Sequence, residues 1–342
     1  MLGNIISFYS YKGGVGRSMA VANVGRLLGL RAAQSGERVL LVDWDLDAPG
    51  LHKFFPVVEA RGDRGHPGLI EFFEAFRNLL ESDEAFANGI DSDGATVLGE
   101  RLPLDSYVVG SGAEGRVDLM MAGSLDPAFR RRSIGFDWAK LYENHPASIR
   151  AFRELIAANY RYCLIDARSG YTDISGICTA LMPDKLVAVF SPNEQNLAGL
   201  LEMVRIAAEY RRNSDDLRPL PVFPLPSRID PGEHDDRRVW LQKFEDGFEK
   251  LITEVYGVAD CRLSEYFSEV QLPYVSYFAY DGRVAVTDEL ASRTSLRKAY
   301  ETFTDMIVSL DYPWQIAEER LRANRASEVG RRPENGVAPT PR

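Results

Sequence analysis

The first 50 residues constrain the fold more than any other part of the chain. A short apolar run at residues 5–9 leads into a turn with three glycines, and an Ala/Leu/Val-rich stretch of helical length follows at residues 18–33. Gly36 ends that stretch, and the continuous apolar run at residues 38–42 is typical of a strand in the middle of a parallel sheet. The order strand, helix, strand predicts one right-handed βαβ unit.

The same alternation continues downstream. Further strands are expected at residues 117–122, 162–165, 186–190, 222–225 and 272–275. Helices are expected at residues 69–81, 148–159, 198–212, 239–255 and 295–310. The alternation predicts an α/β fold: a doubly wound, mostly parallel sheet of about seven strands with helices on both faces.

One stretch departs from this pattern. Near residues 81–115 the composition shifts to Asp, Glu, Ser and Gly, which predicts an acidic surface insertion in the form of a loop. Nothing elsewhere resembles a linker between domains, so residues 1–312 are expected to form one domain. Residues 313–342 are expected to form a charged helix and a disordered tail.

Composition excludes several classes of protein. The 342 residues carry 40 Lys and Arg against 50 Asp and Glu, and a net charge of −10 argues against a protein that mainly coats nucleic acid or anionic membranes. The cysteines, Cys163, Cys178 and Cys261, form no CxxC pair, so neither a disulfide framework nor a zinc site is expected. No apolar run approaches 18 residues and no basic segment precedes an apolar start, so a cytoplasmic location without stable membrane binding is expected.

Residues 11–18 read YKGGVGRS, directly after the first expected strand and at the start of the first expected helix. Glycines let backbone N–H groups close around an anion, and a helix N-terminus adds partial positive charge. This context predicts a phosphate-binding loop, with a glycine-rich turn that binds nothing as the alternative. The common pattern GxxxxGK[ST] fails at two positions, because Tyr11 replaces its first glycine and Arg17 replaces its lysine.

Carboxylates follow two of the expected strands. Asp43 and Asp45 alternate after the second strand, Asp47 continues the alternation, and Asp166 ends the apolar run YCLID. The carboxyl ends of parallel strands form the edge where ligands bind in open α/β sheets. Asp43, Asp45 and Asp166 are therefore candidate site residues, whereas Asp47 is as well explained by a solvated loop.

The loop 11–18 resembles the deviant Walker A motif KGGxGK[ST] of ParA/MinD-like ATPases, P-loop NTPases of the SIMIBI type, at every position except Arg17. The resemblance implies that Lys12 reaches the phosphates of a partner subunit and that ATP drives formation of a homodimer. It implies that Asp45 positions the attacking water and that Arg17 bridges β- and γ-phosphate oxygens. Lys12 and Asp45 are thus the catalytic candidates.

The resemblance also assigns ligand contacts. Mg²⁺ is expected to be held through Ser18, Asp43 and Asp166. The residues implied to bind ATP are Gly13, Gly14, Val15, Gly16, Arg17, Ser18, Met19, Gly170 and Ser227. Before Gly170 the family usually has Asp-Pro, whereas this chain has Arg168 and Ser169.

Recognition of the base is less specified. Ser227 and Arg228 stand where many ParA/MinD members carry an Asn that reads adenine, so ATP is the expectation from the family and no residue argues against GTP. Asn193 could face the nucleotide, but capping the helix that follows is favoured. Aromatic side chains in residues 272–286 are expected to pack rather than to stack on a base.

Two functions remain open at this stage. The first is a Mg²⁺-dependent, slowly hydrolysing ATPase that acts as a nucleotide-driven dimeric switch on an unidentified protein partner. The second, motivated by Arg17 and the altered segment before Gly170, is a nucleotide-binding regulatory module without significant hydrolysis. Arg211, Arg212 and the run 130–132 could contact DNA phosphates, although solvated helix ends are favoured.

Overall fold

The computed structural model describes residues 2–55, 65–110, 117–214, 218–279, 282–287 and 295–316. These residues build a seven-stranded sheet in the order β3-β4-β2-β5-β1-β6-β7, in which every neighbouring pair is parallel except β3 and β4. The strands are β1 (Asn4–Tyr9), β2 (Val39–Trp44), β3 (Val109–Gly110), β4 (Val117–Met120), β5 (Tyr162–Ala167), β6 (Lys185–Phe190) and β7 (Val222–Pro226). The expected fold class is confirmed.

One of the expected strands was wrong. Residues 272–275 form only an isolated bridge between Ile229 and Pro273. The bridge consists of hydrogen bonds from Ile229 N–H to Leu272 at 3.1 Å and from Tyr274 N–H to Ile229 at 2.8 Å, and it does not extend into a ladder. The seventh strand is instead β3, whose two residues pair antiparallel with β4 at the edge of the sheet; its length gave no signal in the sequence.

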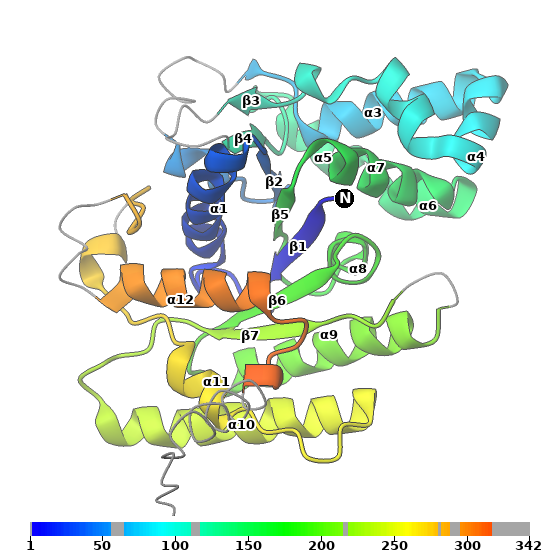
Figure 1. The fold of residues 1–342 in the computed structure, drawn as a ribbon. Coiled ribbons are helices and arrows are strands. Elements are labelled where there is room, and N and C mark those ends of the chain that lie inside the picture. The colour runs from blue at the N-terminus through cyan, green and yellow to red at the C-terminus, as the bar shows by residue number, and fades with distance from the viewer. Residues whose placement is uncertain are drawn as a thin grey trace, which may run out of the picture.

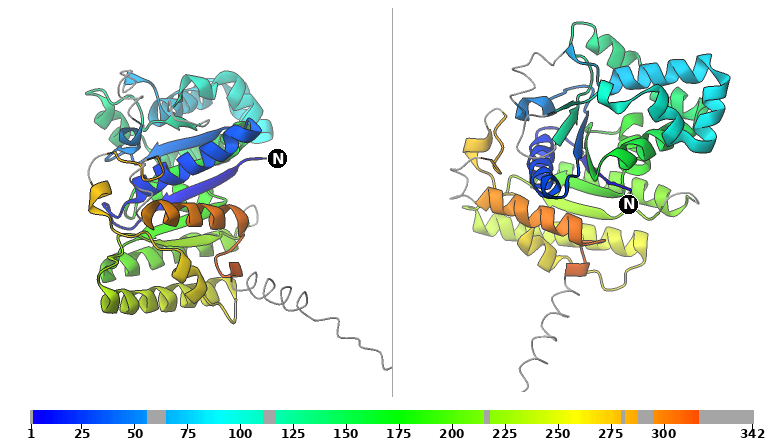
Figure 2. Two further views of the ribbon diagram at one scale, coloured as in Figure 1. Left: turned by 60° about the vertical axis from the view of Figure 1, so that its left-hand side comes forward. Right: turned by 45° about the horizontal axis from the view of Figure 1, so that its top comes forward.

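Helices cover both faces of the sheet (Figures 1 and 2). Helices α1 and α12 pack together on one face, and α3, α7 and α9 pack on the other. The longest helix, α10, lies against α9 beside β7. The helices are α1 (Arg17–Ser35), η1 (Leu51–Phe54), α3 (Leu69–Ser82), α4 (Glu84–Arg101), η3 (Leu104–Ser106), α5 (Phe129–Gly135), α6 (Trp138–Asn144), α7 (Ala147–Asn159), α8 (Asp173–Gly176), η4 (Ile177–Leu181), α9 (Glu194–Arg212), α10 (His234–Tyr256), α11 (Ser264–Glu269), η5 (Ser276–Ala279) and α12 (Ser295–Ser309).

The expected loop near residues 81–115 was also wrong, because most of it is helix α4. Asp83 caps this helix by accepting a hydrogen bond from the N–H of Phe86 at 3.0 Å. Gly94 lies against α7, where an added Cβ would sit 2.7 Å from the Cβ of Ala151. The buried positions Phe86, Ile90, Gly94 and Leu98 repeat every four residues, a helical period that the acidic composition concealed. Residues 111–116 and 317–342, which include the expected tail, lie outside the described part of the chain.

Two glycines let α1 approach the sheet closely. A Cβ on Gly25 would lie 2.6 Å from Leu41 of β2, and a Cβ on Gly29 would lie 2.2 Å from Val117 of β4. Any larger residue would force the helix away, because protein interiors hold almost no spare volume. The close packing of α1 against β2 and β4 fixes the N-terminus of α1 at the carboxyl end of β1.

An aromatic cluster fills the opposite face. The indole of Trp44, at the end of β2, lies 5.7 Å from Phe73 of α3 and 5.5 Å from Trp138 of α6. Phe152 of α7 completes the cluster, 5.0 Å from Phe73. Burial of these rings anchors the end of β2, from which the carboxylates of the candidate site extend.

Candidate functional site

The loop between β1 and α1 has the geometry of an anion-binding loop. Gly14 and Gly16 adopt positive φ angles of 76° and 89°, which residues with a Cβ rarely adopt. Gly16 is the N-cap of α1 and makes no side-chain cap hydrogen bond. The first N–H groups of the helix therefore point out of its N-terminus and are available to an anion.

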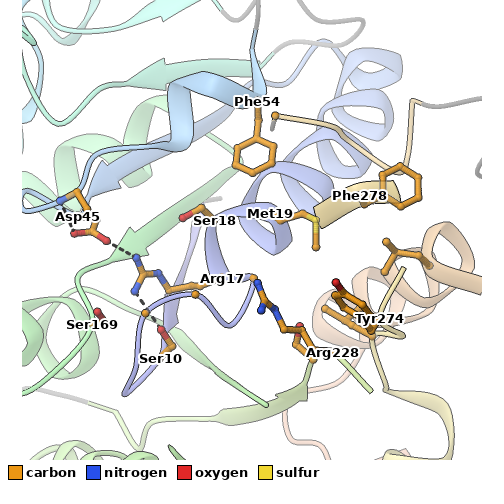
Figure 3. Close-up of a pocket in the computed structure, with 18 of the residues that line it drawn as sticks. Ser10, Arg17, Ser18, Met19, Asp45, Phe54, Ser169, Arg228, Tyr274 and Phe278 are labelled. Carbon is orange, nitrogen blue, oxygen red and sulfur yellow. Dashed lines mark hydrogen bonds and ion pairs between the residues drawn. The ribbon is translucent and has the colours of Figure 1, made fainter. Parts of the chain in front are cut away.

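This loop forms one wall of a cavity of about 510 Å³ at the carboxyl end of the sheet (Figure 3). Residues from the segments after β2, β5 and β7 form the rest of its polar wall. Of the residues expected to bind nucleotide or act in catalysis, those that line the cavity are Gly13, Gly14, Gly16, Arg17, Ser18, Met19, Asp45 and Ser227. The expected residues outside its lining are Lys12, Val15, Asp43, Asp166 and Gly170.

Arg17 does not extend freely into the cavity. Its Nε donates to Asp166 Oδ1 at 2.5 Å and its Nη2 donates to Asp45 Oδ2 at 2.7 Å. Its Nη1 donates to Ser10 Oγ at 3.2 Å, a partner that the sequence did not suggest. Burial opposes its charge, but attraction to Asp166 and Asp45 outweighs burial and raises the pKa of Arg17. In this structure the guanidinium of Arg17 thus bridges the carboxylates of Asp45 and Asp166, and these bonds would have to change before it could bind phosphate.

Asp43 is fully enclosed behind Arg17 and shapes the loop after β2. Its Oδ2 accepts hydrogen bonds from the N–H groups of Gly50 and Leu51, both at 3.1 Å, and its Oδ1 accepts one from Asp45 at 3.2 Å. Burial and the neighbouring charge of Asp166 raise the pKa of Asp43 well above its ordinary value. The hydrogen bonds that Asp43 accepts therefore hold the backbone of Asp45 and of the rest of this loop in place.

Asp166 stands beside Asp43, because β2 and β5 pair in a register that sets these two residues opposite each other. Its Oδ1 bonds to Arg17, whereas Oδ2 is buried and has no hydrogen-bond partner in the described ranges. A buried carboxylate oxygen without a partner is costly, and Mg²⁺ prefers oxygen ligands of this kind. The donors expected for magnesium fit that ion, although the described residues contain no cluster of three acidic, His or Cys side chains that would hold a metal alone.

Lys12 lies outside the lining of the cavity. Its ammonium donates a hydrogen bond to the side-chain oxygen of Gln195 in the first turn of α9. No contact among the described residues places the ammonium of Lys12 in this cavity. Its expected role toward a partner subunit stays a prediction.

The segment after β5 is tied to its surroundings at two points. The carbonyl oxygen of Gly170, whose φ is 85°, accepts a hydrogen bond from Tyr9 at 3.1 Å. The guanidinium of Arg168 pairs with Asp47, and both residues line the cavity. The sequence left Asp47 as a solvated loop residue, but its ion pair with Arg168 links the loops after β2 and β5.

The far end of the cavity is largely apolar. Its walls carry Met19 and Phe54 together with Tyr274 and Phe278, two of the aromatic residues expected only to pack (Figure 3). Asn23 of α1 holds this segment in place by accepting a hydrogen bond from the N–H of Val286 at 3.1 Å. A planar aromatic ligand would find stacking partners here.

Several other candidate residues form hydrogen bonds or ion pairs outside the cavity. Arg211 is buried and donates to the carbonyl oxygens of Ala180 and Pro183, so it is not a solvated helix end and cannot reach DNA. Arg132 pairs with Glu71 and Asp126. Asn193 caps α9, as favoured, by accepting a hydrogen bond from the N–H of Asn196 at 3.0 Å.

The three cysteines are free and buried, and burial raises the pKa of each thiol. Such thiols are poor nucleophiles and poor metal ligands. None of the helices in the described ranges combines the length and hydropathy that crossing a bilayer requires.

No protein-family model and no curated protein sequence matches the chain. Among solved structures, a plasmid partition protein of Borrelia burgdorferi bound to AMPPNP is similar over 90% of this chain and 99% of its own, with 15% identity and a TM-score of 0.55. MinD of Aquifex aeolicus, in complex with MinC, matches over 90% of this chain and 97% of its own, with 16% identity and a TM-score of 0.52. A cobyrinic acid a,c-diamide synthase of Mycobacterium smegmatis with bound ADP and magnesium matches over 90% and 94%, with 15% identity and a TM-score of 0.50.

These similarities show that the chain has the fold of ParA and MinD ATPases over nearly all of its length. The fold alone does not choose a reaction, because it also serves the diamide synthase. Only the residues of the cavity can therefore distinguish one reaction from another.

Proposed function

We propose that this protein is a Mg²⁺-dependent ATPase of slow turnover that acts as a nucleotide-driven dimeric switch in the cytoplasm. The observation that carries the proposal is the cavity itself, where a glycine loop at the N-terminus of α1 faces Asp45 with Asp43 and Asp166 directly behind. Backbone N–H groups that surround an anion, together with carboxylates for a hard cation, are what a nucleotide triphosphate with magnesium requires.

Each residue has a defined part in this proposal. The N–H groups of residues 13–19 bind the phosphates, and Ser227 closes the wall beside Gly16. Gly170, which lies outside the cavity lining in this structure, approaches the γ-phosphate only when nucleotide is bound. Ser18 and Asp166 hold magnesium, with Asp43 in its surroundings. Magnesium neutralises charge on the phosphate oxygens when bound. Asp45 orients the attacking water once Arg17 releases it.

The apolar far end of the cavity, where the base would bind and which we call the base end, supports ATP over GTP. Guanine presents an N1–H and an exocyclic amino group, and proteins commonly bind these donors through a carboxylate. Among the described residues, the carboxylates that line the cavity are Asp45 and Asp47, and both belong to the loop after β2 at the phosphate end. An adenine ring can be held by the apolar and aromatic walls without such an acceptor.

Support for the nucleotide and for a partner also comes from proteins of the same fold. The Borrelia protein binds AMPPNP, the Mycobacterium enzyme binds ADP with magnesium, and the Aquifex MinD binds another protein, MinC. We extend these properties to this chain as a homodimer that forms on ATP and is read by a protein partner. Lys12, which lies outside the lining of its own cavity, is the residue proposed to cross the dimer interface.

A second function is favoured by one observation. The ion pair between Arg17 and Asp45 occupies the carboxylate that would orient water. If that pair persists with nucleotide bound, the protein is a nucleotide-binding regulatory module without significant hydrolysis.

Phosphate release from Mg·ATP separates these functions when it is measured against protein concentration for the native chain and for Lys12→Ala. The switch predicts activity per molecule that rises with concentration and is lost in Lys12→Ala. Lys140→Ala, which removes an exposed lysine of α6, is the matched control and should behave like the native chain. Nucleotide binding without release at any concentration would instead support the regulatory module.

A further inference from the structure

Arg228 has a backbone conformation that arginine rarely adopts. Its φ is 58°, the one positive φ at a non-glycine position in the described chain. Hydrogen bonds fix the backbone on both sides, from Ser227 N–H to Phe190 at 2.7 Å and from Ile229 N–H to Leu272 at 3.1 Å. A left-handed conformation costs energy for a residue with a Cβ, and residues held in this way are concentrated at functional sites.

The conformation sets the side chain over the nucleotide cavity. Arg228 lines the cavity and extends from the segment after β7 toward the glycine loop (Figure 3). The adjoining residue lies against that loop, since a Cβ on Gly16 would be 3.2 Å from the hydroxyl oxygen of Ser227. The guanidinium is therefore carried to the phosphate side of the cavity by a rigid segment.

The other cations of the cavity are already paired. Arg17 bonds to Asp45 and Asp166, and Arg168 pairs with Asp47. Arg228 forms no ion pair or hydrogen bond through its guanidinium within the described ranges, and it is exposed. It is thus the cavity arginine whose charge no carboxylate of the described chain neutralises.

We propose that Arg228 binds the nucleotide phosphates and supplies positive charge that the paired Arg17 does not. A guanidinium can donate two parallel hydrogen bonds to phosphate oxygens, and charged pairs of this kind are strong. The inference rests on the proposed nucleotide-binding function and adds a phosphate contact outside the glycine loop. It also explains why a strained arginine is kept at a position where glycine would be relaxed.

The test is calorimetric binding of AMPPNP, ADP, AMP and adenosine to the full chain and to Arg228→Gln, with Mg²⁺ present. Loss of a charged hydrogen-bond pair predicts that AMPPNP and ADP bind roughly 10- to 100-fold more weakly to Arg228→Gln. Adenosine binding should not change. Arg150→Gln, which removes an exposed arginine of α7, is the matched control and should leave all four affinities unchanged.

Two further variants separate charge from strain. Arg228→Lys keeps the charge but not the paired donors, so AMPPNP should bind with intermediate affinity. Arg228→Gly should bind as weakly as Arg228→Gln, yet unfold at an equal or higher temperature than the native chain because its left-handed conformation is relaxed.

An equal loss of affinity for all four ligands would overturn the inference, because Arg228 would then contact the nucleoside. Native affinity of Arg228→Gln for AMPPNP would overturn it as well. If the native chain itself bound none of the four ligands, the proposed function would fail, and the inference with it.

Discussion

The two ends of the cavity are built in opposite ways. At the phosphate end, Arg17 is buried among carboxylates and bonds to two of them. At the base end, the walls are apolar and aromatic. Arg228 extends from the segment after β7 toward the glycine loop, and it is exposed and forms no ion pair in the described chain. Arg17 is fixed by ion pairs within the protein, whereas the guanidinium of Arg228 is available to a ligand.

The difference indicates which end must rearrange when a ligand binds. A base can stack against the aromatic walls without breaking any ion pair or hydrogen bond of the protein. The phosphate end already balances its charges internally, so magnesium and phosphate must compete with the Arg17 pairs. Breaking such buried pairs is costly unless each charge finds a new partner. The paired Arg17 is therefore expected to control stability, and the unpaired Arg228 to control affinity.

The largest expected effect follows from removing the guanidinium of Arg17. Arg17→Met leaves Asp166 and Asp45 without their cation, and isolated buried charges of this kind cost about 3–5 kcal/mol of unfolding free energy. Urea unfolding without nucleotide measures the loss.

Arg228→Met is the matched comparison at the exposed arginine of the same cavity. It should change the free energy of unfolding by no more than about 0.5 kcal/mol, the range for exposed positions. Equal losses in the two variants would remove the contrast between the two arginines.

A smaller effect is expected when Arg17 becomes the lysine of the common motif. One ammonium cannot match the fork that joins Asp45 and Asp166, so Arg17→Lys should lose about 1–3 kcal/mol of stability. Freed oxygens on Asp166 should at the same time strengthen Mg²⁺-dependent binding of AMPPNP. Calorimetry with and without Mg²⁺ checks the second part, and unchanged Mg²⁺ dependence would count against competition by Arg17.

The pH dependence of stability provides a finer test of the phosphate end. The raised pKa of Asp43 means that the folded state binds a proton more tightly than the unfolded state. Its stabilising contribution is therefore complete below the ordinary pKa of 3.8 and is lost as pH rises through the raised value. Unfolding of native protein and Asp43→Asn in metal-free buffer should show this decline only in the native chain. The same decline in both proteins would assign it to another group.

The smallest effect is expected at the pair of Arg168 and Asp47. Both side chains are partly exposed, so the pair should contribute about 0.5 kcal/mol or less to stability. A double-mutant cycle with Arg168→Gln and Asp47→Asn measures the coupling. A coupling above about 1 kcal/mol would show that this pair behaves like the buried pairs of Arg17.

Local patterns were enough to predict the scaffold. The first βαβ unit and the positions of Asp43 and Asp166 follow from apolar runs and glycines that act over a few residues. Helix α4 was missed because its buried positions lie among acidic and small residues, so hydropathy understated its period. Strand β3 has two residues and depends on its pairing with β4, which no local pattern records.

The sequence predicted which residues belong to the site but not which of them contact one another. The sequence placed Arg17 at a phosphate, yet it could not reveal that Asp45 and Asp166 converge on that arginine from two different strands. Such pairings depend on the register of the sheet. Arg228 was noted only as a substitution, since no local pattern records its positive φ or the hydrogen bonds from its neighbours Ser227 and Ile229 to Phe190 and Leu272, which are distant in sequence.

The most direct measurement is a calorimetric titration of the full chain with AMPPNP, in Mg²⁺ and again in EDTA. The proposed site predicts saturable binding of one nucleotide per chain that weakens clearly when Mg²⁺ is removed, because the proposal has Ser18 and Asp166 hold the cation beside the phosphates. No binding in Mg²⁺, or binding that is equal in EDTA, would contradict the assignment of this cavity as a magnesium nucleotide site.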